Sequence, residues 1–131
     1  MSEPVVSTKP RVLVADDEPA ITALVAEMLG FAGFEVVQAS GSVEAITRAR
    51  AEPPDLVLLD VMMPDLDGRD ACKLLKMDET LRRIPVILFS SADERDVHWR
   101  SAGADGFLQK PFRIRDLPAT VRAFLPRGEP G

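Results

Sequence analysis

Short apolar, β-branched runs alternate with longer runs of helical periodicity, and this alternation restricts the possible folds more than any other feature of the chain. The apolar runs are Val12–Ala15, Glu35–Ala39, Leu56–Leu59, Val86–Phe89 and Gly106–Gln109. Strands that alternate with helices form a parallel sheet with helices on both faces, so the pattern predicts a (βα)5 domain of the α/β class. Leu56–Leu59 and Val86–Phe89 are apolar without alternation, as expected of central strands, whereas the mixed run Glu35–Ala39 is expected at an edge.

Five helices are predicted between and after these strands. The first begins at Pro19, ends at Gly33 and places Ile21, Leu24, Val25, Met28 and Leu29 on one apolar face. The second and third are expected at about Val43–Ala51, with Ser42 as the N-cap, and at about Gly68–Met77, with Ala71, Leu74 and Leu75 facing inward. The fourth is expected at about Asp93–Ala102 before Gly103, and the fifth within Asp116–Phe124, where Pro118 makes the first turn uncertain.

Composition restricts the class of protein. The length of 131 residues indicates one domain, expected at 11–125 between loose tails at 1–10 and 126–131. The net charge is −5 and no basic run exceeds Arg82-Arg83, which argues against direct nucleic-acid binding. No apolar run approaches ~18 residues and the N-terminus does not resemble a signal peptide, so we expect a cytoplasmic protein that does not bind membranes. The single cysteine, Cys72, cannot form an internal disulfide and is expected to pack in the third helix.

Polar residues stand at the carboxyl ends of four of the five predicted strands. Asp16, Asp17 and Glu18 follow the first strand, Asp60 the third, Ser90 and Ser91 the fourth, and Lys110 the fifth. Ligands of open α/β sheets bind beyond these strand ends, so the side chains are expected to converge. Each residue alone is more simply a helix cap or a turn residue; the combination in this order points to a functional site.

The types of residue in this set indicate its chemistry. Carboxylates that converge repel one another and need a cation to stay ionised together, and oxygen ligands without His or Cys suit Mg2+ or Mn2+. A lysine and a hydroxyl supply positive charge and hydrogen bonds of the kind that a phosphoryl group needs. An aspartate that faces such a cluster can be the nucleophile and become an acyl phosphate.

Four segments resemble the receiver domain of bacterial two-component response regulators, over about residues 11–125. They are VLVADDEP at 12–19, LVLLDVMMPDLDG at 56–68, PVILFSSAD at 85–93 and GADGFLQKPF at 103–112. The spacing of Asp60, Pro64 and Gly68 is specific to the family when an acidic pair precedes it and Lys-Pro follows it. The resemblance implies a flavodoxin-like fold with strand order 2-1-3-4-5.

The resemblance also implies a role for each matching residue. Asp60 corresponds to the phosphoacceptor, Ser90 to the switch hydroxyl and Lys110 to the lysine that pairs with phosphoryl oxygens. The implied metal ligands are Asp17 directly, Asp16 through water, Asp60 and the backbone carbonyl of Met62. The bond between Lys110 and Pro111 is expected to be cis.

Phe107 and Trp99 are the candidates for a switch and an interface. Phe107 stands where the family places a switch aromatic on the fifth strand, but it lacks a hydroxyl and can signal only by packing. Trp99 lies about 200° around the predicted fourth helix from Val97, so the two cannot share a face. Trp99 is therefore expected to be partly exposed, as an interface residue or as a neutral surface residue. Glu18 could assist the acidic cluster or cap the first helix, and His98 is expected to be solvated.

The residues favour a signalling switch over two other classes of protein. A histidine kinase or histidine phosphotransfer protein would phosphorylate Asp60 with Mg2+, and the changed conformation would control a downstream protein. We expect a stand-alone single-domain regulator that acts on another protein, or else a domain excised from a longer one, and in either case it catalyses only its own phosphorylation and dephosphorylation. An aspartate-nucleophile phosphohydrolase usually has a second aspartate two residues after the first, where this chain has Met62, and it also has a cap insertion. A receiver fold used only for docking would not need the full acidic site.

Overall fold

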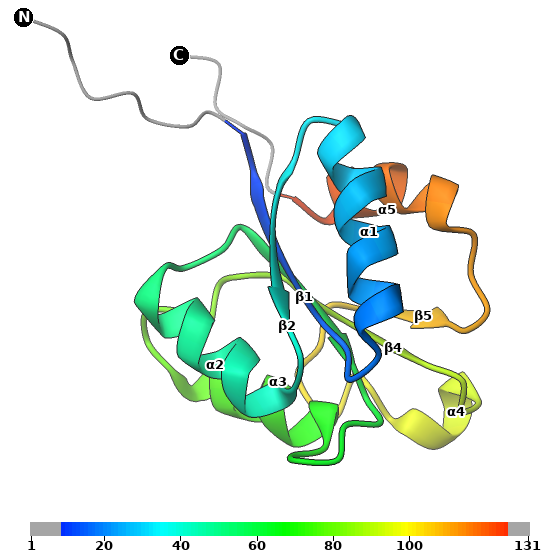
Figure 1. Ribbon diagram of the computed structural model, residues 1–131. Helices are drawn as coiled ribbons and strands as arrows, with labels where there is room; N and C mark the ends of the chain where they lie inside the picture. The colour runs from blue at the N-terminus through cyan, green and yellow to red at the C-terminus, as the bar shows by residue number, and fades with distance from the viewer. Residues whose placement is uncertain (1–8, 126–131) are drawn as a thin grey trace, which may run out of the picture.

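The computed structural model describes residues 9–125 and has the predicted alternation of strands and helices (Figure 1). The strands are β1 (Arg11–Ala15), β2 (Glu35–Ala39), β3 (Leu56–Asp60), β4 (Val86–Ser90) and β5 (Gly106–Gln109). The helices are α1 (Pro19–Phe31), α2 (Ser42–Ala51), α3 (Gly68–Met77), α4 (Glu94–Val97) and α5 (Leu117–Phe124), with a 3-10 turn at Ile114–Asp116 before α5.

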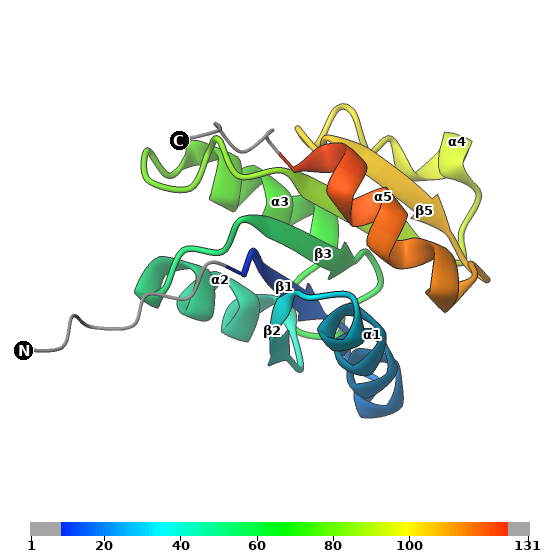
Figure 2. The same ribbon diagram turned by 90° about the horizontal axis from the view of Figure 1, so that it is seen from above.

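All strand pairs are parallel and the order is β2-β1-β3-β4-β5, which confirms the flavodoxin-like topology. The fully buried strands β3 and β4 lie inside the sheet and the mixed strand β2 lies at an edge, as predicted. Helices α1 and α5 cover one face and α2 and α3 the other (Figures 1 and 2). The described part of the chain contains no helix with the length and apolar character needed to cross a bilayer.

The two faces of the sheet carry separate apolar cores. Alternate strand residues, including Leu13 and Leu59, pack with α2 and α3, while their neighbours, including Val14 and Leu58, pack with α1 and α5. A parallel strand buried on both faces has no polar face, which explains the unbroken apolar runs. Burial of these side chains is the main stabilising contribution, at roughly 25 cal/mol per Å2 of apolar surface.

Two helices bury narrower faces than their sequences predicted. Leu24, on the predicted apolar face of α1, is 50% exposed, and Leu74 in α3 is 41% exposed, so the prediction that Leu74 faces inward was wrong. In α3 the buried positions are Gly68, Ala71, Cys72 and Leu75. These follow the i, i+3, i+4, i+7 spacing of one helix face, and Leu74 lies on its flank. The expected packing of Cys72 is confirmed, because its side chain is fully buried.

The predicted fourth helix, Asp93–Ala102, was wrong in length. Only Glu94–Val97 is helical, because His98 has a left-handed backbone with φ 55° and ends the helix. The chain then continues in turns, with Ser101 N–H donating to His98 O and Ala102 N–H to Trp99 O, as far as Gly103 at φ 87°. Trp99 therefore does not lie on a helix with Val97, contrary to the prediction. Trp99 is half-buried nevertheless, and it packs against the α2–α3 side of the core.

The start of α2 corrects a third prediction. The N-cap is Gly41 rather than Ser42, and the Ser42 hydroxyl instead donates to Leu66 O at 2.7 Å. The carboxylate of Asp65, which lies in the loop after β3, accepts from the backbone N–H groups of Ser42 at 3.2 Å and Val43 at 2.9 Å. Because these bonds favour the charged carboxylate, with that from Val43 the largest cause, the pKa of Asp65 is lowered. The cap of α2 thus comes from a loop more than twenty residues away.

Replacing Asp65 with alanine should lower the free energy of unfolding by about 1 to 2 kcal/mol, the usual cost of losing an N-cap. The loss also releases the loop between β3 and α3 from α2. Urea denaturation of the variant beside Glu79→Ala, which removes an exposed carboxylate from the turn after α3, measures the difference. Equal stability of the two variants would show that Asp65 does not cap α2.

Candidate functional site

The predicted site residues meet at one edge of the sheet. Asp60 and Ser90 are the last residues of β3 and β4, while Asp16 and Lys110 follow β1 and β5 directly. The strand register aligns these ends, since Asp60 pairs with Phe89 and Ser90 with Gln109. Backbone bonds from Asp16 N–H to Ala39 O and from Lys110 N–H to Ser90 O extend the ladder into the site. The sheet itself therefore brings together residues that are up to 94 positions apart.

Three carboxylates form the floor and rim of the site. Oxygen atoms of Asp16, Asp17 and Asp60 all lie within 4.8 Å of one another. Asp16 is fully buried and Asp60 is 3% exposed, while Asp17 is exposed at the rim. This donor set has only oxygen atoms and one open side, which fits a hard divalent cation such as Mg2+ or Mn2+ that keeps several water ligands.

Lys110 lies against two of these carboxylates. Its Nζ is 3.2 Å from Asp16 Oδ2 and 3.4 Å from Asp60 Oδ2. Burial by itself would lower the pKa of Lys110, but the charges of Asp60 and Asp16 outweigh this effect and raise it. The lysine therefore stays charged at neutral pH, in the position where oxygens of a group on Asp60 would need a cation.

Asp60 carries an unfavourable charge when no cation is bound. Burial raises its pKa to about 6, and repulsion from Asp16 adds to the effect. Attraction to Lys110 and the bond from Met62 N–H to Asp60 Oδ1, at 3.1 Å, compensate only in part. A cation or an added electrophile at this edge would relieve the repulsion, so the site is poised to bind one.

The loop between β3 and α3 folds tightly over the backbone of Asp60. Gly68 N–H donates to Val61 O at 2.8 Å, and Val61 N–H donates to Phe89 O at 2.9 Å. A Cβ atom on Gly68 would lie 2.1 Å from Asp60 O and 2.8 Å from Val61 Cα. The glycine in the spacing Asp60, Pro64, Gly68 is thus required by close backbone contact.

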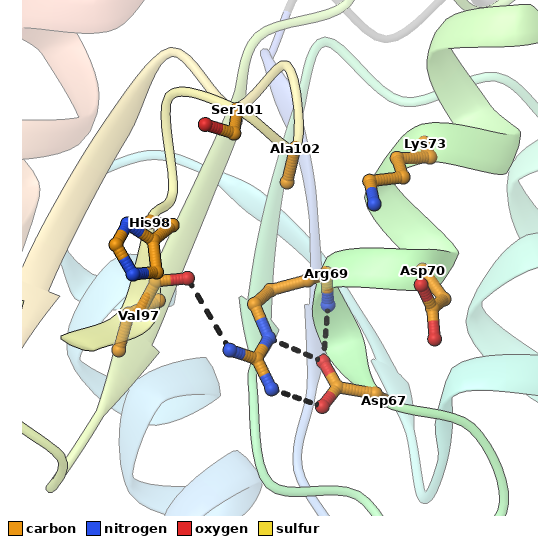
Figure 3. A pocket seen from close by; sticks show the side chains of 8 residues that line it. All are labelled: Asp67, Arg69, Asp70, Lys73, Val97, His98, Ser101 and Ala102. Atoms are coloured by element: carbon orange, nitrogen blue, oxygen red, sulfur yellow. Dashed lines mark hydrogen bonds and ion pairs between the residues drawn. The ribbon is translucent and has the colours of Figure 1, made fainter.

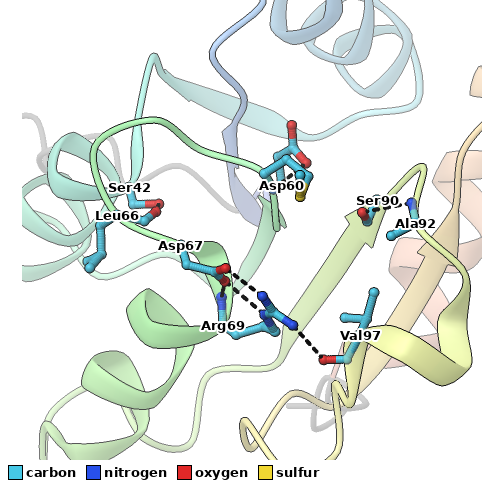
Figure 4. A network of polar contacts seen from close by, with 9 residues as sticks. Ser42, Asp60, Leu66, Asp67, Arg69, Ser90, Ala92 and Val97 are labelled. Carbon is cyan, nitrogen blue, oxygen red and sulfur yellow. Dashed lines mark hydrogen bonds and ion pairs between the residues drawn. The ribbon is translucent and has the colours of Figure 1, made fainter.

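Ser90 and Met62 lie beside Asp60 in different environments. Ser90 is fully buried, and its Oγ accepts from Ala92 N–H at 3.1 Å (Figure 4). Met62 is 62% exposed at the mouth of the site. Glu18, which sequence reasoning left between two roles, is the N-cap residue of α1 without a side-chain capping bond, while its backbone N–H donates to Asp16 Oδ1 at 3.0 Å.

Sequence reasoning missed a polar network beside the site. Asp67, the N-cap of α3, accepts from the backbone of Arg69 at 2.8 Å and pairs with its guanidinium at 2.6 Å. Arg69 also donates to Val97 O at the end of α4, at 3.3 Å (Figure 3). An aspartate directly before a helix is a recognisable capping signal, but nothing in the local sequence points from Arg69 to Val97.

The structure places Phe107 and Trp99 at the border of the apolar core. Both are half-buried and pack against the core on the α2–α3 side. Trp99 Nε1 donates to Glu94 at 2.9 Å, and the Arg100 guanidinium lies 4.3 Å from its ring centre. The peptide bond between Lys110 and Pro111 is cis, as the resemblance implied.

Comparison with known proteins shows which family the chain belongs to. The family model for the response regulator receiver domain matches residues 12–122. The chain belongs to the response regulator receiver domain family. Over 121 residues, 91% of this chain, it is 39% identical to the alkaline phosphatase synthesis transcriptional regulatory protein PhoP of Bacillus subtilis, covering 50% of that protein. It is 38% identical over 122 residues, 92% of this chain, to the response regulator MprA of Mycobacterium avium, covering 53% of it.

Solved receiver structures share the fold over most or all of their length. The chemotaxis response regulator CheY4 of Vibrio cholerae is 29% identical, with a TM-score of 0.84 over 90% of this chain and 100% of that one. The BeF3-activated DrrB receiver domain is 31% identical, with a TM-score of 0.78 over 89% of this chain and 97% of that one. This receiver spans about half the length of the curated relatives that it matches.

Proposed function

We propose that residues 11–125 form a receiver that accepts a phosphoryl group on Asp60 from a histidine kinase or a histidine phosphotransfer protein, with Mg2+ or Mn2+. The position of Asp60 supports this most strongly. Its carboxylate is buried between the cation of Lys110 and the carboxylates of Asp16 and Asp17. Phosphorylation changes the conformation of the receiver, and the changed conformation controls a downstream partner protein. As a response regulator receiver, the chain is a signalling module rather than a classical enzyme.

The reaction joins a carboxylate oxygen of Asp60 to phosphorus as the bond from phosphorus to the donor's imidazole nitrogen breaks, and the imidazole leaves with the electron pair. In the resting site Lys110 contacts the Asp60 carboxylate. After phosphorylation its ammonium group pairs with the phosphoryl oxygens instead. Asp17, Asp60, the Met62 carbonyl and, through water, Asp16 would hold Mg2+, and the bound ion would help to neutralise the phosphoryl charge. The Ser90 hydroxyl then binds a phosphoryl oxygen, and Phe107 repacks behind it.

An apolar hollow next to the site suits the donor protein. Ile21, Leu24, Pro111, Phe112 and Ile114 line it together with Lys110, and its volume is about 430 Å3. This hollow explains why Leu24 is apolar yet half exposed. A donor whose histidine reaches Asp60 past exposed Asp17 would cover this hollow and would therefore lie on the α1 side of the site.

Two further parts of the proposal rest on the family. We place the protein in the cytoplasm, where a kinase has access to ATP. The target is a protein, and the absence of direct contact with nucleic acid stays a prediction. Another relative, 38% identical over 90% of this chain, is the DNA-binding dual master transcriptional regulator RpaA of Synechocystis, and this chain covers 50% of that protein.

Incubation with acetyl phosphate tests the proposed function. Intact-protein mass spectrometry should show addition of a single phosphoryl group in the presence of Mg2+, and none in excess chelator, because the acidic cluster repels an anionic donor. Undiminished labelling in chelator would contradict the metal-dependent function. Turnover of a generic phosphate ester would instead favour a phosphohydrolase.

Asp17→Asn should weaken Mg2+ binding by about tenfold or more, equivalent to about 1.4 kcal/mol. Asp16→Asn should weaken it less, because both Asp16 oxygens are already engaged, by Lys110 and by Glu18 N–H. Mg2+ itself should bind weakly, since it keeps several waters. Titrations followed by the fluorescence of Trp99 measure the three affinities, and an equal or reversed order of the variants would overturn the assignment of the direct ligand.

A further inference from the structure

The segment that follows Ser90 is held at its start by one side chain from the neighbouring strand. Gln109, the last residue of β5, donates from Nε2 to Ser91 O at 3.1 Å and to Ala92 O at 2.7 Å. Its Oε1 accepts from Glu94 N–H at 3.1 Å. A single amide thus ties three backbone groups of residues 91–94 to the edge of the sheet.

A second side chain holds the end of the same segment. Arg69, at the start of α3, donates to Val97 O, the last carbonyl of α4, at 3.3 Å. The guanidinium is fixed by two bonds to Asp67, at 2.9 and 2.6 Å, so it is presented to Val97 in one orientation (Figure 3). Residues 91–97 therefore lie between two side-chain anchors.

Both anchors are attached to the framework of the phosphoacceptor site. Gln109 directly precedes Lys110, and Arg69 directly follows Gly68, which packs against the carbonyl of Asp60. Residues 91–97, in contrast, directly follow Ser90, the hydroxyl assigned to a phosphoryl oxygen. The two anchors thus connect segment 91–97, which must move when Ser90 moves, to the part of the site that includes Gly68 and Lys110.

We propose that Gln109 and Arg69 are positioning residues that hold segment 91–97 in its resting arrangement and so weaken the affinity of the site for a phosphoryl group on Asp60. The inference rests on the proposed function and adds to it the regulation of the same site. It assigns to this chain two side-chain contacts that set the balance between resting and phosphorylated arrangements.

The resting turn shows how the anchors act. Ser90 Oγ accepts from Ala92 N–H within this turn, while the Ala92 carbonyl is held by Gln109 (Figure 4). Drawing the hydroxyl toward a phosphoryl group on Asp60 loosens this turn, and the bonds of Gln109 and Arg69 oppose the displacement. A ligand that favours one arrangement binds less tightly when the other is stabilised, so removing an anchor shifts the population toward the phosphorylated arrangement.

Gln109→Leu and Arg69→Met test the proposal, with beryllofluoride and saturating Mg2+ as the probe. Each variant should bind beryllofluoride about threefold to tenfold more tightly than the wild type. This is about the net effect of one typical hydrogen bond, and Gln109→Leu removes three partly exposed bonds to the segment while Arg69→Met removes one. Calorimetry gives the Kd without relying on Trp99, and the fluorescence of Trp99 gives a second estimate.

Matched substitutions elsewhere separate positioning from a general effect on the fold. Gln38→Leu changes an exposed glutamine in β2, at the opposite edge of the sheet. Arg50→Met breaks a pair with Asp78, at 3.3 Å, between α2 and the end of α3. Both controls should leave the Kd for beryllofluoride at the wild-type value, and all four variants should keep the wild-type Kd for Mg2+. A merely structural role of the anchors would change the melting temperature and leave the Kd for beryllofluoride unchanged.

The wild type separates a failure of the proposed function from a failure of the two anchors. If it does not bind beryllofluoride in the presence of Mg2+, the proposed function fails and this inference fails with it. If the wild type binds while Gln109→Leu and Arg69→Met bind equally or more weakly, the anchors do not hold the resting arrangement, and the proposed function is unaffected.

Discussion

Gly68→Ala should destabilise the protein by about 3 kcal/mol or more, at or beyond the upper end of the usual cost of overpacking. The added methyl group would lie 2.1 Å from Asp60 O and 2.9 Å from Asp60 C. These are backbone atoms at the end of a fully buried strand, so they cannot turn aside as the tip of a flexible side chain could. Relief requires α3 or the end of β3 to move, and either movement displaces Asp60.

Gly30→Ala is the matched control for this substitution. A Cβ atom on Gly30 meets nothing within 4 Å, and the residue lies in the last turn of α1. Alanine there should be neutral or should stabilise the protein by up to about 1 kcal/mol, because it favours the helical backbone more than glycine does. Urea denaturation compares the two variants with the wild type, and a Gly68→Ala protein as stable as Gly30→Ala would refute the close contact.

Asp60→Asn should stabilise the protein by about 2 to 3 kcal/mol at pH 7.5 in the absence of divalent cations, the equivalent of its pKa displacement. Burial and repulsion from Asp16 raise the pKa of Asp60 from 3.8 to about 6 in the folded protein. Asparagine removes the buried charge but can still accept from Met62 N–H. Lys110 keeps its pair with Asp16 in the variant.

The sign of the pH dependence follows from the raised pKa. Between pH 3.8 and about 6 the folded state binds more protons at Asp60 than the unfolded state does. The wild type therefore loses stability as the pH rises through this window, and the full cost is present above it. The difference in the free energy of unfolding between Asp60→Asn and the wild type should vanish near pH 4. It should become smaller when Mg2+ is added at pH 7.5. Asp70→Asn, at an exposed position of α3, has the same change in charge and should show neither effect.

Much of the site could be predicted because a parallel sheet places the carboxyl ends of its strands together. Asp16, Asp60, Ser90 and Lys110 lie where the strand assignments put them, and the predicted end of α1 at Gly33, with φ 97°, is confirmed. These features depend on local patterns of apolar residues, acids and glycine. Such patterns are strong when the strands are buried on both faces.

The errors arose where contacts between distant residues decide the local structure. The end of α4 depends on the left-handed backbone of His98. No glycine or proline at this point of the sequence indicates that the helix ends there. The cap of α2 comes from Asp65 and the anchor of the β4–α4 loop from Gln109, and both bonds join segments remote in the sequence. Trp99 was expected on a helix, but it lies in a turn beside Glu94.

Locating the phosphoryl group shows whether Asp60 is the acceptor. Wild type, Asp60→Asn and Asp65→Asn should be incubated with acetyl phosphate and Mg2+ and analysed by intact-protein mass spectrometry. Asp65 provides the control because it lies in the loop after β3 and is an exposed carboxylate whose charge is removed in the same way. We expect one phosphoryl group on the wild type and on Asp65→Asn, and none on Asp60→Asn; equal labelling of all three proteins would show that Asp60 is not the acceptor.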